Sequence, residues 1–128
     1  MNAELRRRVI ARAAGRCEYC SLSQDRVPLV FHIEHIIPRQ HGGPTELENL
    51  ALACGNCNQH KGPNLTGLDP DTGSLCRLFH PRQDTWAAHF RRSGGLVLGI
   101  TSTGRTTVWV LDMNSKLMRE RRSRDQRG

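Results

Sequence analysis

The expected fold rests on three stretches of sequence: Phe31-His32-Ile33-Glu34-His35-Ile36-Ile37-Pro38, Glu48-Asn49-Leu50, and Cys54-Gly55-Asn56-Cys57-Asn58-Gln59-His60-Lys61. The first belongs to an apolar, β-branched run between two prolines, which predicts a strand over residues 29–37. Residues 39–44 predict a loop, and residues 49–53 predict the second strand of a hairpin. Cys54 then opens a short helix that Gly62-Pro63 ends. These elements, in this order, predict a small α+β core.

A further C-x-x-C pair lies upstream, at Cys17 and Cys20, and matches the pair at Cys54 and Cys57. Thiolates bind zinc well, and a two-residue spacer lets both sulfurs of a pair face one ion. The 33 residues between the pairs exceed the common spacing of about 15–20, and a hairpin with a loop fills the excess. We therefore expect a structural zinc ion with four thiolate ligands, the alternative being four buried free cysteines. Cys76 stands alone and is expected to be a core thiol.

The chain has 128 residues, of which 37% are hydrophobic and 5% aromatic. That length suits one domain with a modest core, to which a bound metal would add a useful cross-link. The sequence has no run of about 18 apolar residues, and its N-terminus lacks the apolar segment of a secretory signal, so neither a membrane span nor export is predicted. Five cysteines without such a signal favour metal ligation in a reducing compartment, the cytoplasm.

The formal net charge is +7, and the positive charge is concentrated at the two ends of the chain. Residues 1–16 hold five arginines and one glutamate, and residues 116–128 hold six basic and two acidic residues. Each end therefore carries +4, and the stretch between them carries −1. Arginine-rich helices can simply be solvated. Two basic ends that flank a near-neutral middle favour a polyanionic partner instead.

The segments around the central core also have recognisable patterns. Residues 3–14 predict a basic amphipathic helix, capped by Asn2 and ended by Gly15. A short strand is expected over residues 75–79, whereas residues 64–73 are typical of a loop and residues 86–90 fit either a strand or a helix. Residues 96–100 and 106–111, joined by a turn at 102–104, predict a C-terminal β-hairpin. From Asn114 onward the pattern is that of a basic helix followed by a charged tail.

These motifs resemble the HNH nucleases of the ββα-metal type. The resemblance covers residues 17–62 closely, and the 78–81 and 103–106 segments are similar to a small bacterial branch of that family. It rests on the two cysteine pairs and on Ile33 to Pro38, Gly42-Gly43, Glu48-Asn49-Leu50, Asn58 and Lys61-Gly62. The resemblance implies one nuclease domain over residues 1–128. Asn58 stands where histidine is frequent, which makes this an H-N-N variant, and Glu34 stands where aspartate is common.

Hydrolysis of a phosphodiester needs an activated water, a cation on the phosphate oxygens and help for the leaving alkoxide. A neutral imidazole suits the first task, so His35 is the expected general base. Glu34 and the amide oxygen of Asn58 are the expected ligands of a catalytic Mg²⁺ or Mn²⁺ ion. The resemblance implies the same roles and gives Asn49 the task of holding the hairpin and the base in place.

A regular strand would turn the side chains of Glu34 and His35 to opposite faces, so the strand must bend or end there. His32 shares the face of Glu34 and is expected either as an extra ligand or as a supporting residue.

DNA is therefore the expected substrate of a metal-dependent endonuclease, with RNA left open and no signal for oligomeric state. The candidate contacts to nucleic acid are eight basic side chains: Arg6, Arg7, Arg39, His41, His60, Lys61, Arg121 and Arg122. Two other functions stay open at this point: a zinc-containing nucleic-acid-binding module with weak or lost catalysis, and a zinc-ribbon adaptor for protein partners. The intact Glu34-His35 pair counts against the first, and the basic ends count against the second.

Overall fold

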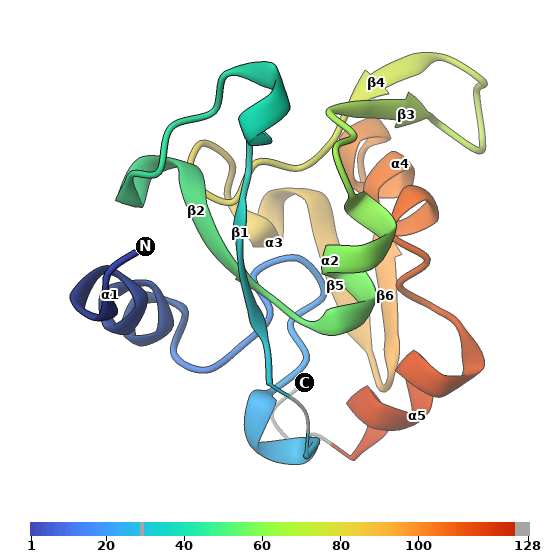
Figure 1. Ribbon diagram of the computed structural model, residues 1–128. Helices are drawn as coiled ribbons and strands as arrows, with labels where there is room; N and C mark the ends of the chain where they lie inside the picture. Colours follow the sequence, from blue (N-terminus) through green and yellow to red (C-terminus); the bar gives the residue numbers. More distant parts are fainter. Residues whose placement is uncertain (29, 125–128) are drawn as a thin grey trace.

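The computed structural model describes residues 1–28 and 30–124. Its elements follow the chain (Figure 1) in the order α1 (Ala3–Ala13), β1 (His32–His35), β2 (Leu50–Ala53), α2 (Gly55–Lys61), β3 (Thr66–Leu68), β4 (Leu75–Arg77), α3 (Trp86–His89), β5 (Phe90–Ser93), β6 (Leu96–Gly99), α4 (Ser102–Val110) and α5 (Lys116–Ser123). Short 3-10 turns cover Gln24–Arg26, Arg39–His41 and Leu47–Asn49. Within the described residues the strands form three two-stranded sheets. The prediction of a mixed helix and strand fold is confirmed.

The hairpin around the Glu34-His35 dipeptide is present, and β1 and β2 pair antiparallel along their full length. β1 is shorter than the predicted strand, because it ends at His35 and not at Ile37. The side chain of Asn49 takes the place of a strand partner there. Asn49 Oδ1 accepts from the Ile37 N–H at 2.9 Å, and Asn49 Nδ2 donates to the Ile37 carbonyl at 3.0 Å. The chain therefore leaves the sheet directly after the dipeptide that carries the expected chemistry.

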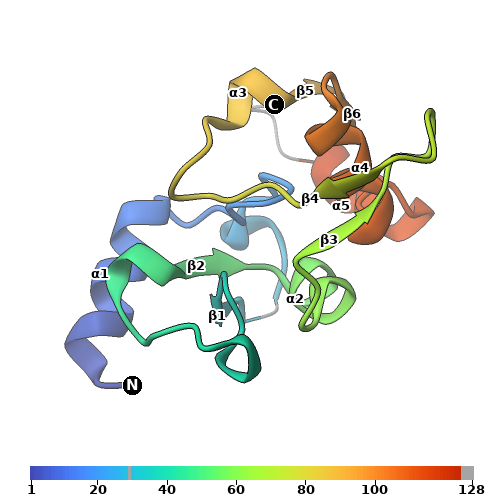
Figure 2. The same ribbon diagram turned by 90° about the horizontal axis from the view of Figure 1, so that it is seen from above.

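Two helices pack against this hairpin, α1 against β2 and α2 against both strands. Asn2 caps α1 as predicted, since its Oδ1 accepts from the Leu5 N–H at 2.8 Å. Arg12 anchors α1 to the hairpin, because its guanidinium donates to the carbonyls of Leu47 and Leu50 at 2.9 and 2.7 Å. Figure 2 shows α1 beside β2, with α2 at the other end of the strands.

A second hairpin, β3 with β4, packs on α4 (Figure 2). Residues 64–73 were predicted to be a loop, and the structure corrects this, because Thr66–Leu68 pairs with Leu75–Arg77. Gly67 lies at the centre of β3, where the approach of α4 leaves no room for a side chain. A Cβ at Gly67 would lie 2.5 Å from a methyl carbon of Val110. Glycine is therefore required for this packing.

The C-terminal β-hairpin is present, and the strand predicted over residues 96–100 is found as β6, but its partner is not the predicted one. β6 pairs with β5 through a turn at Gly94-Gly95, while residues 106–111 lie in α4 and its end. Thr101 caps α4 by accepting from the Gly104 N–H at 3.0 Å. The Asn114 amide occupies the free edge of β6, bonding the N–H and the carbonyl of Val97 at 2.9 and 2.8 Å. A helix cap and an occupied strand edge thus override the β-branched composition of residues 106–111.

Residues 86–90, which fitted either state, divide into the helical turn α3 and the first residue of β5. α5 forms where a basic C-terminal helix was predicted, but Met118 and Arg122 on it are buried. No helix within the described residues is long and apolar enough to cross a membrane. The apolar core includes Val9, Tyr19, Leu22, Phe31, Ile36, Leu50, Leu52, Leu78, Phe79, Phe90, Val97, Leu111, Met113 and Met118.

Candidate active site and metal centre

The four predicted zinc ligands, Cys17, Cys20, Cys54 and Cys57, lie together in the core. Their sulfur atoms are all within 4.8 Å of one another, and those of Cys20 and Cys54 are 3.8 Å apart. A tetrahedron of sulfurs about 2.3 Å from a zinc ion has edges of about 3.8 Å, so the cluster fits that ion. The N–H of Cys20 donates to Cys17 Sγ and that of Cys57 to Cys54 Sγ, both at 3.4 Å. Four thiolates leave no open position for water, which makes the site structural.

Three of these thiols, Cys17, Cys20 and Cys57, differ in how readily they lose a proton. Burial raises the pKa of Cys17, and hydrogen bonds with the other three sulfurs raise the pKa of Cys57. Hydrogen bonds from Cys17, Cys54 and Cys57 hold the pKa of Cys20 well below its ordinary value, and the positive charge of Arg122 acts in the same direction. A metal ion has to displace the protons that remain, so zinc binding should weaken as the pH falls.

The predicted catalytic residues line an open hollow of about 490 Å³. Its walls come from β1, from the turn that follows it and from α2, and they consist of Ile33, Glu34, His35, Pro38, Arg39, Gln40, Asn58 and Gly62. The predicted base and both predicted cation ligands therefore border one space. The end of β1 at His35 removes the strict alternation that would otherwise separate Glu34 from His35.

His35 is half-buried where it borders the hollow. Its Nε2 shares a hydrogen bond of 2.8 Å with Thr45 Oγ1, from the loop before β2, and this contact orients the ring. Burial lowers the pKa of His35 below its ordinary value, and the charges of Arg39 and of the Met1 ammonium act in the same direction. The imidazole is therefore neutral at pH 7 and can accept a proton.

Glu34 is only 7% exposed, and each of its oxygens has a partner. Tyr19 donates its hydroxyl hydrogen to Glu34 Oε1, and the Lys61 ammonium lies 3.4 Å from Oε2. Lys61 also donates to the Ile36 carbonyl at 2.8 Å. Burial raises the pKa of Glu34, while the charge of Lys61 and the Tyr19 hydrogen bond oppose that rise. A carboxylate has about four acceptor positions, so Glu34 keeps capacity for a further ligand.

The turn after His35 is held together by Asn49, which is buried. Besides its two bonds to Ile37, Asn49 donates through Nδ2 to the Pro44 carbonyl at 2.9 Å. Gly43 passes so close to this network that a Cβ there would lie 1.7 Å from the Ile37 carbonyl oxygen. These contacts are of the kind that the predicted supporting role of Asn49 requires.

The structure corrects two of the eight predicted nucleic-acid contacts. Lys61 and Arg122 are 2% and 0% exposed, so neither can reach a phosphate. Glu34 holds Lys61 inside, and the Gly95 carbonyl is among the groups that hold Arg122. Arg39 borders the hollow, which places an exposed cation next to the candidate site. The other predicted contacts keep accessible side chains: Arg6, Arg7, His41 and His60 are exposed, and Arg121 is half-buried.

Two residues that were not predicted, Tyr19 and Thr45, contact the predicted ones directly. Tyr19 lies between the cysteines of the first pair, and its separation of 15 residues from Glu34 gives no sign of their hydrogen bond. Thr45 follows a glycine- and proline-rich loop, where only turn signals are visible. His32, expected as an extra ligand or a supporting residue, is exposed on β1 and is not part of the hollow.

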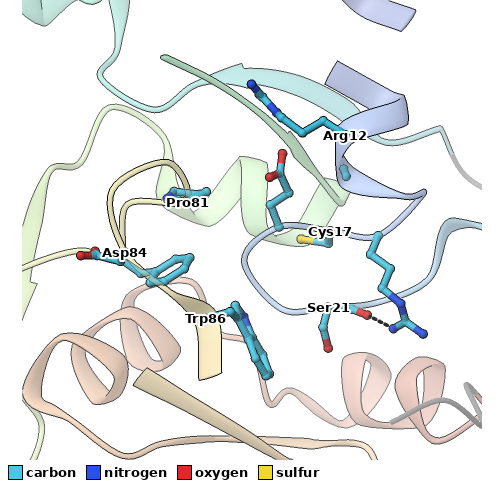
Figure 3. Close-up of a pocket in the computed structure, with 10 residues that line it drawn as sticks. Arg12, Cys17, Ser21, Pro81, Asp84 and Trp86 are labelled. Carbon is cyan, nitrogen blue, oxygen red and sulfur yellow. Dashed lines mark hydrogen bonds between the residues drawn. The ribbon is translucent and has the colours of Figure 1, made fainter. Parts of the chain in front are cut away.

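A separate hollow of about 260 Å³ lies between α1, the first cysteine pair and residues 79–86 (Figure 3). Its polar groups bind protein atoms: Arg16 donates to the Ser21 carbonyl at 2.7 Å, the dashed contact in Figure 3, and Asp84 accepts from Arg77 at 2.6 Å. None of the predicted catalytic residues lines it. The hollow beside His35 is therefore the candidate active site.

A comparison with protein families gives a match over the part of the chain that holds the cysteine cluster and this hollow. Residues 17–64 match the HNH endonuclease family. This HNH segment contains the four-cysteine cluster, which fits the zinc-binding variant of the family, and every residue that lines the hollow beside His35. The match points to a nuclease or nucleic-acid-binding role. No curated protein and no solved structure gave a significant match.

Proposed function

We propose that this protein is a metal-dependent endonuclease that hydrolyses the phosphodiester bonds of DNA. The observation that carries the proposal is the hollow in which His35, Glu34 and Asn58 border one open space of about 490 Å³. That volume lies in the usual range of small-ligand sites, about 300–1,000 Å³. The match of the surrounding residues to the HNH endonuclease family supports the same function.

His35 is proposed as the general base that takes a proton from the attacking water. An imidazole that donates from Nε2 to Thr45 Oγ1 carries its proton on that nitrogen, which leaves Nδ1 as the acceptor. The lowered pKa of His35 keeps the ring in this neutral form at physiological pH. Asn49 supports the base indirectly, because it fixes the turn that begins directly after His35.

Glu34 and Asn58 are proposed to hold a divalent cation, Mg²⁺ or Mn²⁺, in the hollow. Oxygen donors suit these ions, and one or two protein ligands completed by water is their usual arrangement. A bound cation would supply positive charge to the phosphate oxygens and to the leaving alkoxide. Lys61 and Tyr19 fix the Glu34 carboxylate in place, and the charge of Lys61 favours its ionised form.

DNA is proposed to bind across the hollow, held by exposed basic side chains on either side. Arg39 lies in the wall of the hollow, and Arg6 and Arg7 are exposed on α1. Phosphate contacts of this kind position a duplex without reading its sequence. We propose that residues 1–128 form one nuclease domain. Its place would be the reducing cytoplasm, where free thiols such as those of the five cysteines persist.

A nucleic-acid-binding module without catalysis is the second candidate, and one observation favours it. Glu34 already has the Tyr19 hydroxyl at one oxygen and the Lys61 ammonium near the other, which is the arrangement of a structural ion pair. In that case Arg39 would bind phosphate at the hollow without a cation.

Supercoiled plasmid distinguishes the two candidates. The zinc-loaded protein is incubated with plasmid and Mg²⁺ or Mn²⁺, and in parallel with no added cation or with EDTA, and the products are separated on a gel. An endonuclease converts plasmid to nicked or linear forms only when the cation is present. A binding module shifts a short duplex on a native gel and leaves the plasmid intact in every condition. Zinc analysis of each sample shows whether EDTA has also emptied the four-cysteine site.

A further inference from the structure

Arg122, on α5, is the largest fully buried side chain of the described residues. Its Nε donates to the Gly95 carbonyl at 2.8 Å, and its Nη2 donates to Asn114 Oδ1 at 3.1 Å and to the Met113 carbonyl. Its Nη1 is buried and has no hydrogen-bond partner within the part of the chain that the structure describes. All of the partners are neutral, so they satisfy hydrogen bonds without balancing the charge.

A buried cation usually has an anion beside it, because an isolated charge is costly to remove from water. Even two half-buried arginines have such an anion, since Arg82 pairs with Glu18 and Arg105 pairs with Asp69. No aspartate or glutamate of residues 1–28 and 30–124 lies within ion-pair distance of Arg122. The carboxylates of these residues therefore leave the charge of Arg122 unbalanced.

The four-cysteine cluster supplies such an anion, because four thiolates around one Zn²⁺ leave two excess negative charges in the core. Met118 of α5 belongs to the same buried core cluster as the four cysteines. Arg92 connects the first cysteine pair with α5. Its Nη1 donates to Ser21 Oγ at 3.0 Å, and its Nη2 donates to the Arg122 carbonyl at 3.1 Å. Ser21 follows Cys20 directly, so α5 is fastened to the first cysteine pair.

We propose that Arg122 is the counter-charge of the zinc–thiolate centre, a positioning residue that strengthens zinc binding. The four sulfurs fill the coordination sphere of the ion, so the guanidinium acts from outside it, through its charge. Groups in this position orient metal ligands and tune their affinity. The proposal rests on the four-cysteine site alone and holds whether or not the hollow beside His35 cleaves DNA.

Three variants separate the charge of Arg122 from its size: Arg122→Met, Arg122→Lys and, as the matched control, Arg119→Met. Arg119 lies on the same helix and is exposed. Zinc affinity is measured by competition with a chromogenic chelator, and circular dichroism checks the fold. Arg122→Met should weaken zinc binding by about 10- to 100-fold, the usual effect of removing such a supporting group. Arg122→Lys keeps the charge and should recover most of that loss, while Arg119→Met should bind zinc like the wild type.

Wild-type zinc affinity in a folded Arg122→Met protein would overturn the proposal. Zinc binding by Arg122→Lys that is as weak as that of Arg122→Met would overturn it too, because shape and not charge would then matter. If Arg122→Met does not fold, Arg122→Gln, which keeps a donor for the carbonyls, replaces it with the same expected loss. Thermal unfolding of Arg122→Met, with and without zinc, separates the charge of Arg122 from its packing. The counter-charge role predicts a larger loss of stability in the zinc-loaded than in the zinc-free protein, whereas a packing role predicts equal losses.

Discussion

The Lys61 ammonium lies 3.4 Å from the Glu34 carboxylate, and the two side chains are only 2% and 7% exposed. This ion pair joins the last residue of α2 to β1, beside the hollow that His35 borders. Lys61 therefore helps to set the charge of the carboxylate for which we propose a cation-binding role. Its removal should affect both the stability of the fold and the affinity for a divalent cation.

Lys61→Met leaves Glu34 buried without its cation. Removal of one partner of a buried ion pair costs about 3–5 kcal/mol, so the free energy of unfolding should fall by about that amount. Urea unfolding measures the loss. The double variant Glu34→Gln/Lys61→Met is the matched control, and it should recover most of the stability because neither charge remains. Equal stabilities of the single and double variants would show that the two charges are not coupled.

The sequence predicts the HNH segment well because its signals are local. β-branched residues between prolines mark β1, the cysteine spacing marks the metal cluster, and Gly62-Pro63 marks the end of α2. These features depend on neighbours in the chain, so they can be recognised without knowledge of the tertiary contacts.

The errors fall where distant contacts decide the outcome. Residues 106–111 have the composition of a strand, but Asn114 fills the edge that a partner strand would need. Lys61 and Arg122 have the character of surface cations, and partners distant in the sequence, such as Glu34 and the Gly95 carbonyl, explain their burial. A basic residue in a helix gives no local sign of such partners.

Asn49→Ala should loosen the turn that follows His35. The substitution removes the Asn49 partners of the part-buried N–H and carbonyl of Ile37, which should lower the free energy of unfolding by about 1–3 kcal/mol. Plasmid cleavage should slow as well, because the base loses its support. Urea unfolding and a cleavage time course measure the two effects, with the exposed Asn64→Ala as control. Wild-type stability and a wild-type cleavage rate in Asn49→Ala would show that Asn49 supports neither the turn nor the base.

Asp69 gives the fold a pH dependence. It is 1% exposed, accepts from Arg105 Nη2 at 2.8 Å and from Ser102 Oγ at 2.7 Å, and the Arg105 hydrogen bonds hold its pKa well below the ordinary value of 3.8. The folded protein therefore binds this proton less tightly than the unfolded chain does. Asp69 stabilises the fold above the ordinary carboxyl pKa, and this contribution is lost as the pH falls below it.

The corresponding variant is Asp69→Asn. Its urea midpoint should lie below that of the wild type at pH 7, and the gap should narrow at about pH 2 because the wild-type carboxylate then begins to lose its advantage. Glu46→Gln, at an exposed position, should show no such gap at either pH. A gap of the same size at both pH values would mean that Asp69 acts by its shape and not by its charge.

The exposed arginines at the C-terminal end of the described chain, Arg119 on α5 and Arg124 directly after it, are expected to contact DNA phosphates. Truncation at residue 119 would also remove buried Arg122, so point changes are the cleaner test. Each phosphate contact contributes about −0.9 to the log–log dependence of duplex affinity on salt, so Arg119→Gln/Arg124→Gln should make that slope shallower by up to about two units. Fluorescence anisotropy of a labelled duplex measures the slope. An unchanged slope in this variant, with a shallower slope in Arg6→Gln/Arg7→Gln, would show that α1 and not these two arginines contacts the phosphates.

The proposed role of His35 as general base is tested most directly by the single-turnover cleavage rate of His35→Ala on duplex DNA with saturating Mg²⁺ or Mn²⁺. His32→Ala is the matched control, because His32 is exposed on the same strand and lies outside the hollow. Loss of a general base should lower the rate by about 10²- to 10⁴-fold, with zinc content and DNA affinity unchanged, while His32→Ala should cleave like the wild type. Cleavage by His35→Ala at the wild-type rate would contradict the account, because the water would then be activated by another residue.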